Sequence, residues 1–136
     1  YASRGLGDVY KRQINNYRFI RYSDVLLMYA ECLNATGATG DAYQYVDRVR
    51  DRAGLAPLPT GMSQQDFLEQ IKHERLLELT GEGHRFNDLK RWGDLNSSLS
   101  SKDSGFNNFQ TGKHELLPIP QIDLDINPNL EQNPGW

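Results

Sequence analysis

The carboxylates between residues 74 and 93 are the first candidates for chemistry in this sequence. Glu74, Glu78 and Glu82 recur every four residues, so they lie on one face of a helix, and Asp88 follows them. Such a row could exchange protons or bind a metal ion, but no HExxH or paired-histidine spacing accompanies it. We therefore predict no metal site and no catalytic residue in this stretch.

Arginines alternate with these carboxylates. Arg85, Asp88 and Arg91 recur every three residues, and Arg75 directly follows Glu74. Neighbouring guanidinium groups keep carboxylates ionised rather than poised for proton transfer. We predict a structural ion-pair network in which the acidic row takes partners from Arg75, Arg85 or another helix. Phe86, Leu89 and Trp92 also recur every three residues, so they form an apolar helix face that we expect to pack in the core.

A second acidic pattern, from Asp123 to Asn129, looks like the start of a calcium loop. That loop needs Gly at its sixth position and Glu at its twelfth, where this chain has Pro128 and Pro134. Asp123 and Asp125 would lie ~7 Å apart on an extended chain. They would point the same way, however, whereas a glycosidase places its two carboxylates on opposite sides of a sugar ring. We predict that these side chains cap turns.

An aromatic and amide group in a Ser- and Gly-rich loop is the candidate ligand site. Phe106, Asn107, Asn108 and Phe109 are consecutive. Aromatic faces stack on the C–H surfaces of sugars, and amides hydrogen-bond to sugar hydroxyls. A glycan or partner contact is one interpretation, and anchoring of the loop by the two phenylalanines is the other.

Composition excludes several classes of function. The chain has 136 residues, enough for one domain, and its net charge is -3. Without a basic surplus we expect no nucleic-acid binding and no electrostatic attraction to membranes. No nucleophile, nucleotide or dinucleotide motif is present, so we predict no enzyme activity and no cofactor. The single cysteine, Cys32, is expected to be buried and inert.

Two helical hairpins are predicted, over residues 21–54 and 63–93. The first helix runs from Tyr22 or Ser23, the possible N-cap, to Thr36, and the second runs from an Asp41 N-cap to Ala53. Their predicted apolar stripes are Val25, Leu26, Tyr29, Ala30 and Leu33, then Ala42, Tyr45, Val46, Val49 and Ala53.

The second hairpin is expected to start with a capping-box-like pair, Ser63 and Asp66, which opens its first helix. Gly81 and Gly83 break the helical pattern before a short helix from His84 to Trp92. The size of the hairpins predicts an all-α, tetratricopeptide-like fold.

The two ends of the chain differ from the hairpins. Residues 1–13 show no periodicity and are typical of a non-native or disordered leader, to which we assign no function. Residues 94–136 are predicted to form a surface loop and a proline-rich extended strap. The alternation of Ile122, Leu124 and Ile126 suggests an extended segment with one buried face. The prolines of this region exclude a central strand.

Several separate stretches together resemble the C-terminal part of the SusD/RagB family. They are RYSDVLLMYAECLNATG, VDRVRDRAGL, ERLLELTGEGHRFNDLKRWGDL and LLPIPQIDLDINPNLEQNPGW, in the order that the family has. The most specific residues, interpreted as a structural family motif, are Glu74, Arg75, Glu78, Glu82, Gly83, Arg85, Asp88, Leu89, Arg91 and Trp92. The ending Gln132-Asn133-Pro134-Gly135 carries an aromatic last residue, Trp136.

The resemblance implies a non-catalytic role in nutrient uptake. Members of the family hold oligosaccharide at the bacterial outer-membrane surface and deliver it to a TonB-dependent transporter. The implied partners are that transporter and a glycan, and the implied membrane attachment is a lipid anchor that this sequence lacks. Residues 14–136 are then the C-terminal portion of a longer protein. A helical-repeat scaffold for protein–protein interaction is the alternative.

Overall fold

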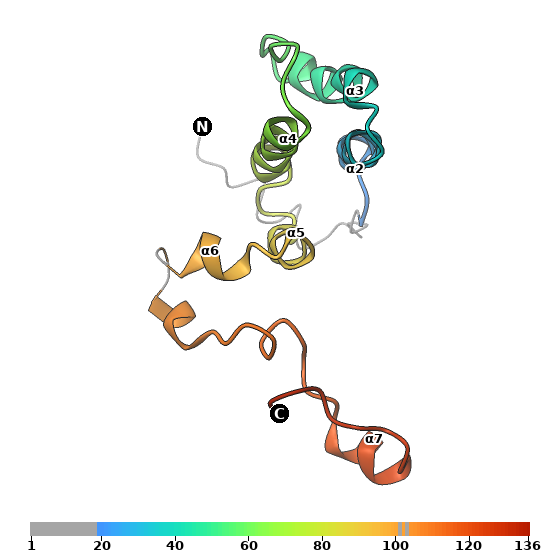
Figure 1. Ribbon diagram of the computed structural model, residues 1–136, viewed down its shortest axis with the longest axis vertical. Coiled ribbons are helices and arrows are strands. Elements are labelled where there is room, and N and C mark those ends of the chain that lie inside the picture. The colour runs from blue at the N-terminus through green and yellow to red at the C-terminus, as the bar shows by residue number, and fades with distance from the viewer. Residues whose placement is uncertain (1–18, 101, 103) are drawn as a thin grey trace, which may run out of the picture. The chain divides into compact units, whose positions relative to one another are not determined.

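The computed structural model describes residues 19–100, 102 and 104–136, and this part of the chain is helical without any β-strand (Figure 1). The all-α prediction is therefore confirmed, whereas the predicted leader at residues 1–13 lies outside the described residues. The chain divides into two compact units, residues 1–78 and 79–136.

The first unit begins with a helical hairpin. Helix α2 spans Tyr22–Ala35 and helix α3 spans Thr39–Arg52, close to the predicted bounds. Gly37 closes α2 with φ +87°, while the amide of Ala38 donates to the carbonyl of Leu33 at 2.9 Å. Glycine tolerates this left-handed conformation, which turns the chain directly into α3. The two helices are antiparallel, because Tyr22 contacts Arg48 and Tyr29 contacts Tyr45.

Helix α4, which spans Gln64–Glu78, packs against both helices of the hairpin. Ser63 opens it as predicted, since the Asp66 amide donates to Ser63 Oγ at 3.1 Å. Asn34 is buried and joins the helix ends: its side-chain amide donates to the Gln64 carbonyl, and its side-chain oxygen accepts from Thr39. Local caps and one buried amide thus fix where the three helices meet.

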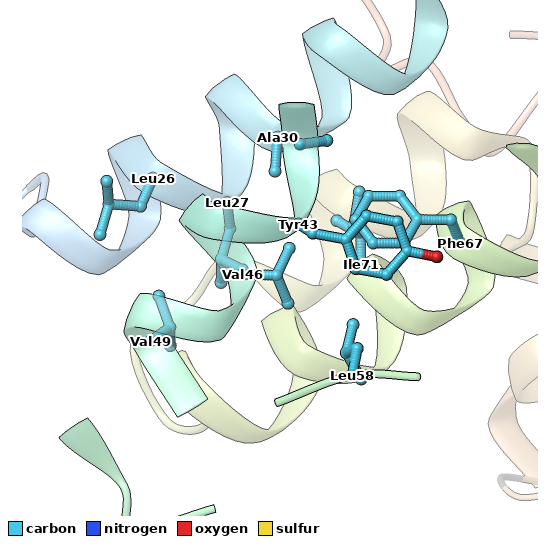
Figure 2. Packing of buried hydrophobic residues seen from close by; sticks show 10 residues of the cluster. Leu26, Leu27, Ala30, Tyr43, Val46, Val49, Leu58, Phe67 and Ile71 are labelled. Atoms are coloured by element: carbon cyan, nitrogen blue, oxygen red, sulfur yellow. The ribbon is translucent and has the colours of Figure 1, made fainter. Parts of the chain in front are cut away.

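One hydrophobic core lies between α2, α3 and α4 (Figure 2). Tyr43 and Phe67 pack with ring centroids 4.5 Å apart, and the Tyr43 hydroxyl accepts a hydrogen bond from the Met62 amide. Ala30 and Ala42 are fully buried, and their small side chains allow α2 and α3 to approach closely. The remaining core residues are Leu26, Leu27, Val46, Val49, Leu58 and Ile71.

Several details of the hairpin prediction were wrong. Ser23 and Asp41 lie inside their helices, and the N-cap positions belong to Arg21 and Ala38. Val25, Tyr29 and Ala53 are exposed, whereas Leu27 and Tyr43, which the stripes omitted, are buried. Cys32 is exposed, contrary to expectation. The cause is that α2 carries apolar residues around most of its circumference, so periodicity alone could not select the buried face.

The second unit contains shorter elements. Helix α5 spans Arg85–Trp92, as predicted, and follows the break at Gly81 and Gly83, both with positive φ. It is followed by α6 (Leu95–Leu99), the 3₁₀ helix η1 (Ser104–Asn108) and α7 (Gln121–Ile126). Leu89 and Leu95 are its most buried apolar side chains. Because α4 and α5 fall in different units, the hairpin over residues 63–93 stays a prediction.

The C-terminal prediction needs two corrections. The predicted surface loop after Asn96 includes α6 and η1. The segment around Leu124, expected to be extended, is helix α7, and its Ile122 and Ile126 are 67% and 76% exposed. A side-chain bond of 2.8 Å from Gln121 to Asp125, four residues on, supports the helix. An alternation of three apolar residues was too short to distinguish the two structures.

Candidate functional site: an aromatic row near the C-terminus

The structure brings together Phe106 of η1 and Phe109, which directly follows this helix. Their rings stack with centroids 5.0 Å apart and planes inclined by 21°. The Phe109 amide donates to the Phe106 carbonyl at 2.9 Å, which fixes the turn that aligns the rings. Both side chains are half-buried, and Asn107 and Asn108 beside them are exposed. The four predicted site residues therefore combine ring surface with exposed amides.

The stack continues into residues that the sequence did not connect with it. The His114 ring lies 5.7 Å from Phe109 and 5.7 Å from Trp136. The His114 Nδ1 accepts from the Gln110 amide at 2.8 Å, which orients the imidazole between the two rings. We define the aromatic row as Phe106, Phe109, His114 and Trp136.

Trp136 is held in this row by the backbone. Its indole Nε1–H lies 3.2 Å from the carbonyls of both Lys113 and Leu116, and Lys113 Nζ lies 4.7 Å above the ring centroid. The ring is still 47% exposed. A lysine beside an exposed indole adds positive charge to an otherwise neutral stacking surface. The sequence signal for Trp136 was its position after the Asn-Pro-Gly turn, which does not reveal its partners.

The residues Gln132 to Gly135 explain how Trp136 reaches its position. The Gln132 side chain donates to the Ile119 carbonyl and accepts from the Ile119 amide, and the Asn133 side chain donates to the Leu117 carbonyl. Gly135 has φ +84°, and a Cβ there would lie 3.0 Å from the Lys113 side chain. Two side-chain amides and one glycine thus hold the last residues against residues 113–119.

Two carboxylates of the predicted row, Glu74 and Glu78, form ion pairs with arginines outside α4, as predicted. Arg75 donates to Asp24 at 2.7 Å, and both side chains are at least 95% buried. Arg50 of α3 pairs with Glu74. The pairs join α4 to both helices of the hairpin.

Glu78 forms ion pairs with two arginines, Arg21 at 3.1 Å and Arg52 at 2.6 Å. Burial by itself raises the pKa of Glu78, but the hydrogen bonds from Arg52 and Arg21 outweigh it and lower the pKa. The buried Ser23 Oγ forms no hydrogen bond of ordinary geometry with any described residue. We therefore assign the lowered pKa to the two arginines, which keep this carboxylate ionised.

The rest of the motif lies in the second unit. Asp88 is buried and accepts from Arg91 Nε at 3.0 Å, and the Arg91 guanidinium lies 4.6 Å from the Trp92 ring centroid. Leu89 is buried, but Phe86 of the same predicted face is 48% exposed, so the apolar face is only partly covered. Glu82, Gly83 and Arg85 lie at the turn before α5 and at its start.

Two kinds of site are absent from the described part of the chain. Among residues 19–100, 102 and 104–136, no group of three His, Cys, Asp or Glu side chains is placed to hold a metal ion. In the same residues, no helix has the length and apolar character needed to cross a bilayer.

Helical packing, internal ion pairs and a partly exposed aromatic row define a helical protein whose surface chemistry suits binding. The SusD family model matches residues 5–136, and the chain belongs to this family. SusD-like protein P25 of Formosa agariphila is 39% identical over 122 residues, covering 85% of this chain and 23% of the relative. SusD-like protein P2 of the same organism is 34% identical over 152 residues, covering all of this chain and 29% of the relative.

Solved structures agree with the family. A SusD superfamily protein from Bacteroides vulgatus has a TM-score of 0.83 at 37% identity, covering 92% of this chain and 28% of that one. A SusD homolog from Bacteroides thetaiotaomicron has a TM-score of 0.80 at 35% identity, covering 88% of this chain and 27% of that one. The chain thus spans about a quarter of the length of these relatives.

Proposed function

We propose that this chain is the C-terminal portion of a surface binding protein that captures a glycan or similar nutrient and performs no chemical step. The family match over residues 5–136 carries this proposal. The protein would sit at the outer-membrane surface through a lipid anchor and deliver its ligand to a TonB-dependent transporter. The ion-pair network of α4 and the Asp88–Arg91 pair would serve folding alone.

The aromatic row is the candidate glycan contact within this chain. Phe106, Phe109 and Trp136 offer partly exposed ring faces, and the apolar faces of sugars stack on such rings. Asn107 and Asn108 supply exposed amides that can donate to and accept from hydroxyl groups. Binding of this kind needs neither a metal ion nor a cofactor.

Glycan binding by the full-length protein tests both parts of this proposal. We expect glycan-array binding, and a loss of about tenfold in affinity for the Phe106→Ala, Phe109→Ala double variant, because each ring contact contributes about 0.5–1.5 kcal/mol. Phe86→Ala, which removes a 48% exposed phenylalanine elsewhere in the same unit, is the matched control. Asn107→Ala with Asn108→Ala removes the amides and leaves the stack in place.

The outcomes separate the site from the function. Glycan binding that all these variants retain would overturn the aromatic row as the site and leave the function standing. A full-length protein that binds no glycan and does not co-purify with a transporter would overturn the function. Capture of a protein partner instead would favour the alternative of a helical-repeat scaffold, for which the exposed apolar face of α2 is the supporting observation.

A further inference from the structure

A hollow of about 760 Å³ lies where helix α2 begins and helix α3 ends. Its volume falls within the range of about 300–1,000 Å³ that small-molecule sites have. Its charged lining residues are three arginines, Arg21, Arg48 and Arg52, and one aspartate, Asp51. The carboxylate of Glu78 pairs with Arg21 and Arg52. Among these groups one positive charge remains in excess, and nothing in the proposed function uses it.

Arg48 is the guanidinium group of this hollow that is available to a ligand. It lies over the Tyr22 ring, 5.2 Å from the centroid. Within residues 19–100, 102 and 104–136, its side chain forms neither an ion pair nor a hydrogen bond. Contact with a ring face uses no hydrogen-bond donor, so the N–H groups of Arg48 stay available. Their planar fork matches two oxygens of one oxyanion.

Arg52 adds a second set of donors on the same side of α3, four residues after Arg48. Its side chain is 63% exposed, and only its Nη2 donates to Glu78 among the described residues. The C-terminal carbonyls of α3 oppose an anion weakly, because the amides of residues 53–55 already donate to them. The two arginines therefore determine the charge that the hollow favours.

The start of α2 is a second feature of the hollow that favours an anion. Its N-cap, Arg21, forms no capping hydrogen bond with its side chain, so the amides of the first turn stay available. Asp24, the acidic residue of that turn, is neutralised by Arg75. Ser23 lines the hollow, is 8% exposed, and its Oγ has no hydrogen-bond partner among the described residues. A buried polar atom without a partner is one mark of an absent ligand or ion.

We propose that this hollow binds the carboxylate or sulfate group of an acidic saccharide. Arg48 and Arg52 hold the oxyanion, and the Tyr22 ring, which is 61% exposed beside Arg48, contacts the sugar ring. The site shares no residue with the aromatic row, and it makes the protein selective for charged glycans. That the oxyanion is carried by a saccharide rests on the proposed function, whereas the binding of an oxyanion does not.

Isothermal titration calorimetry with the full-length protein tests the proposal. Each acidic probe has a neutral counterpart: digalacturonate and its methyl ester, and sulfated lactose and lactose. Inorganic sulfate is the remaining probe. We expect each acidic probe to bind at least about tenfold more tightly than its neutral counterpart, because hydrogen bonds to a charged group contribute more than those between neutral groups.

A variant of Arg48 connects this preference with the hollow. Arg48→Gln should weaken the binding of both acidic probes at least about tenfold. Arg48 is chosen because Arg52 also pairs with Glu78, whereas the exposed Arg48 can be replaced without loss of an ion pair within the described residues. Lys90→Gln is the matched control: it removes one positive charge from an exposed position of α5 and should change the affinity by less than about twofold. Arg48→Lys keeps the charge without the planar fork and should restore only part of the affinity.

Acidic probes that bind no more tightly than neutral ones overturn the proposal, and so does unchanged affinity in Arg48→Gln. Either result leaves glycan capture by the aromatic row standing. Inorganic sulfate that binds as tightly as sulfated lactose overturns the assignment to a saccharide and makes the hollow a site for a free anion. A full-length protein that binds no saccharide, neutral or acidic, overturns the proposed function as well.

Discussion

Replacement of Arg75 by methionine should destabilise the protein more than any other single loss of charge in α4. Arg75 and Asp24 are 2.7 Å apart, and their side chains are only 3% and 5% exposed. Removal of one partner leaves the other charge buried without compensation, which costs about 3–5 kcal/mol. The total stability of a domain is about 5–15 kcal/mol, so this loss is a large fraction of it.

Urea unfolding monitored by circular dichroism measures this loss, provided that the slope of the free energy against urea concentration is unchanged. Lys72→Met is the matched control: it lies on the same helix and breaks the Lys72–Glu69 pair, in which the lysine is 15% and the glutamate 57% exposed. That change should cost about 0.2–1 kcal/mol. The double variant Asp24→Leu, Arg75→Met should recover most of the stability, to within about 1 kcal/mol of the natural chain, because it removes both buried charges.

Two results would contradict this prediction. A cost for Arg75→Met that equals the cost for Lys72→Met would show that burial does not amplify the pair. A double variant as unstable as the single variant would show that packing of the Arg75 side chain, and not its charge, is what matters.

Further predictions concern Glu78 and Gly135. The folded-state pKa of Glu78 is lowered from 4.5, so its ion pairs stabilise the fold above that pH and are lost as the pH falls toward the lowered value. Between about pH 7 and about pH 3, the melting temperature of Glu78→Gln should fall less steeply than that of the natural chain; parallel curves would contradict this. Gly135→Ala, with φ +84° and a Cβ 3.0 Å from Lys113, should cost about 1–2 kcal/mol and shift the Trp136 indole N–H resonance. Gly37→Ala, with φ +87° and an open Cβ position, should cost a similar amount and leave that resonance in place.

Local signals in the sequence were sufficient to predict the larger helices. Gly37, Gly54 and Gly93 end three of them with positive φ, and each position is recognisable because a glycine follows an apolar periodic segment. Ser63 was recognisable as an N-cap because Asp66, three residues later, completes a capping-box-like pair. Such signals act within one helical turn, where the sequence contains all the interacting partners.

Contacts between distant residues could not be predicted in this way. The Glu74–Glu82 row indicated that arginines would be needed, but not that Glu78 would pair with Arg21, which is 57 residues away. The aromatic row could not be predicted either, because Trp136 and Lys113 meet only after residues 117–133 have turned back. Only the folded chain shows which of several chemically equivalent partners is near enough to bind.

The ion pairs of α4 also determine its register against the hairpin. Glu74 and Glu78 are separated by about one turn, ~6 Å along the axis. A shift of α4 by four residues would therefore leave a glutamate facing Arg50. The same shift would place Leu79 opposite Asp24 and bury that carboxylate without a partner, while Arg75 would enter the apolar position of Ile71. The Arg75–Asp24 pair thus distinguishes two registers that the glutamates alone would leave equivalent, which gives a buried charge pair a structural role even where its net contribution to stability is small.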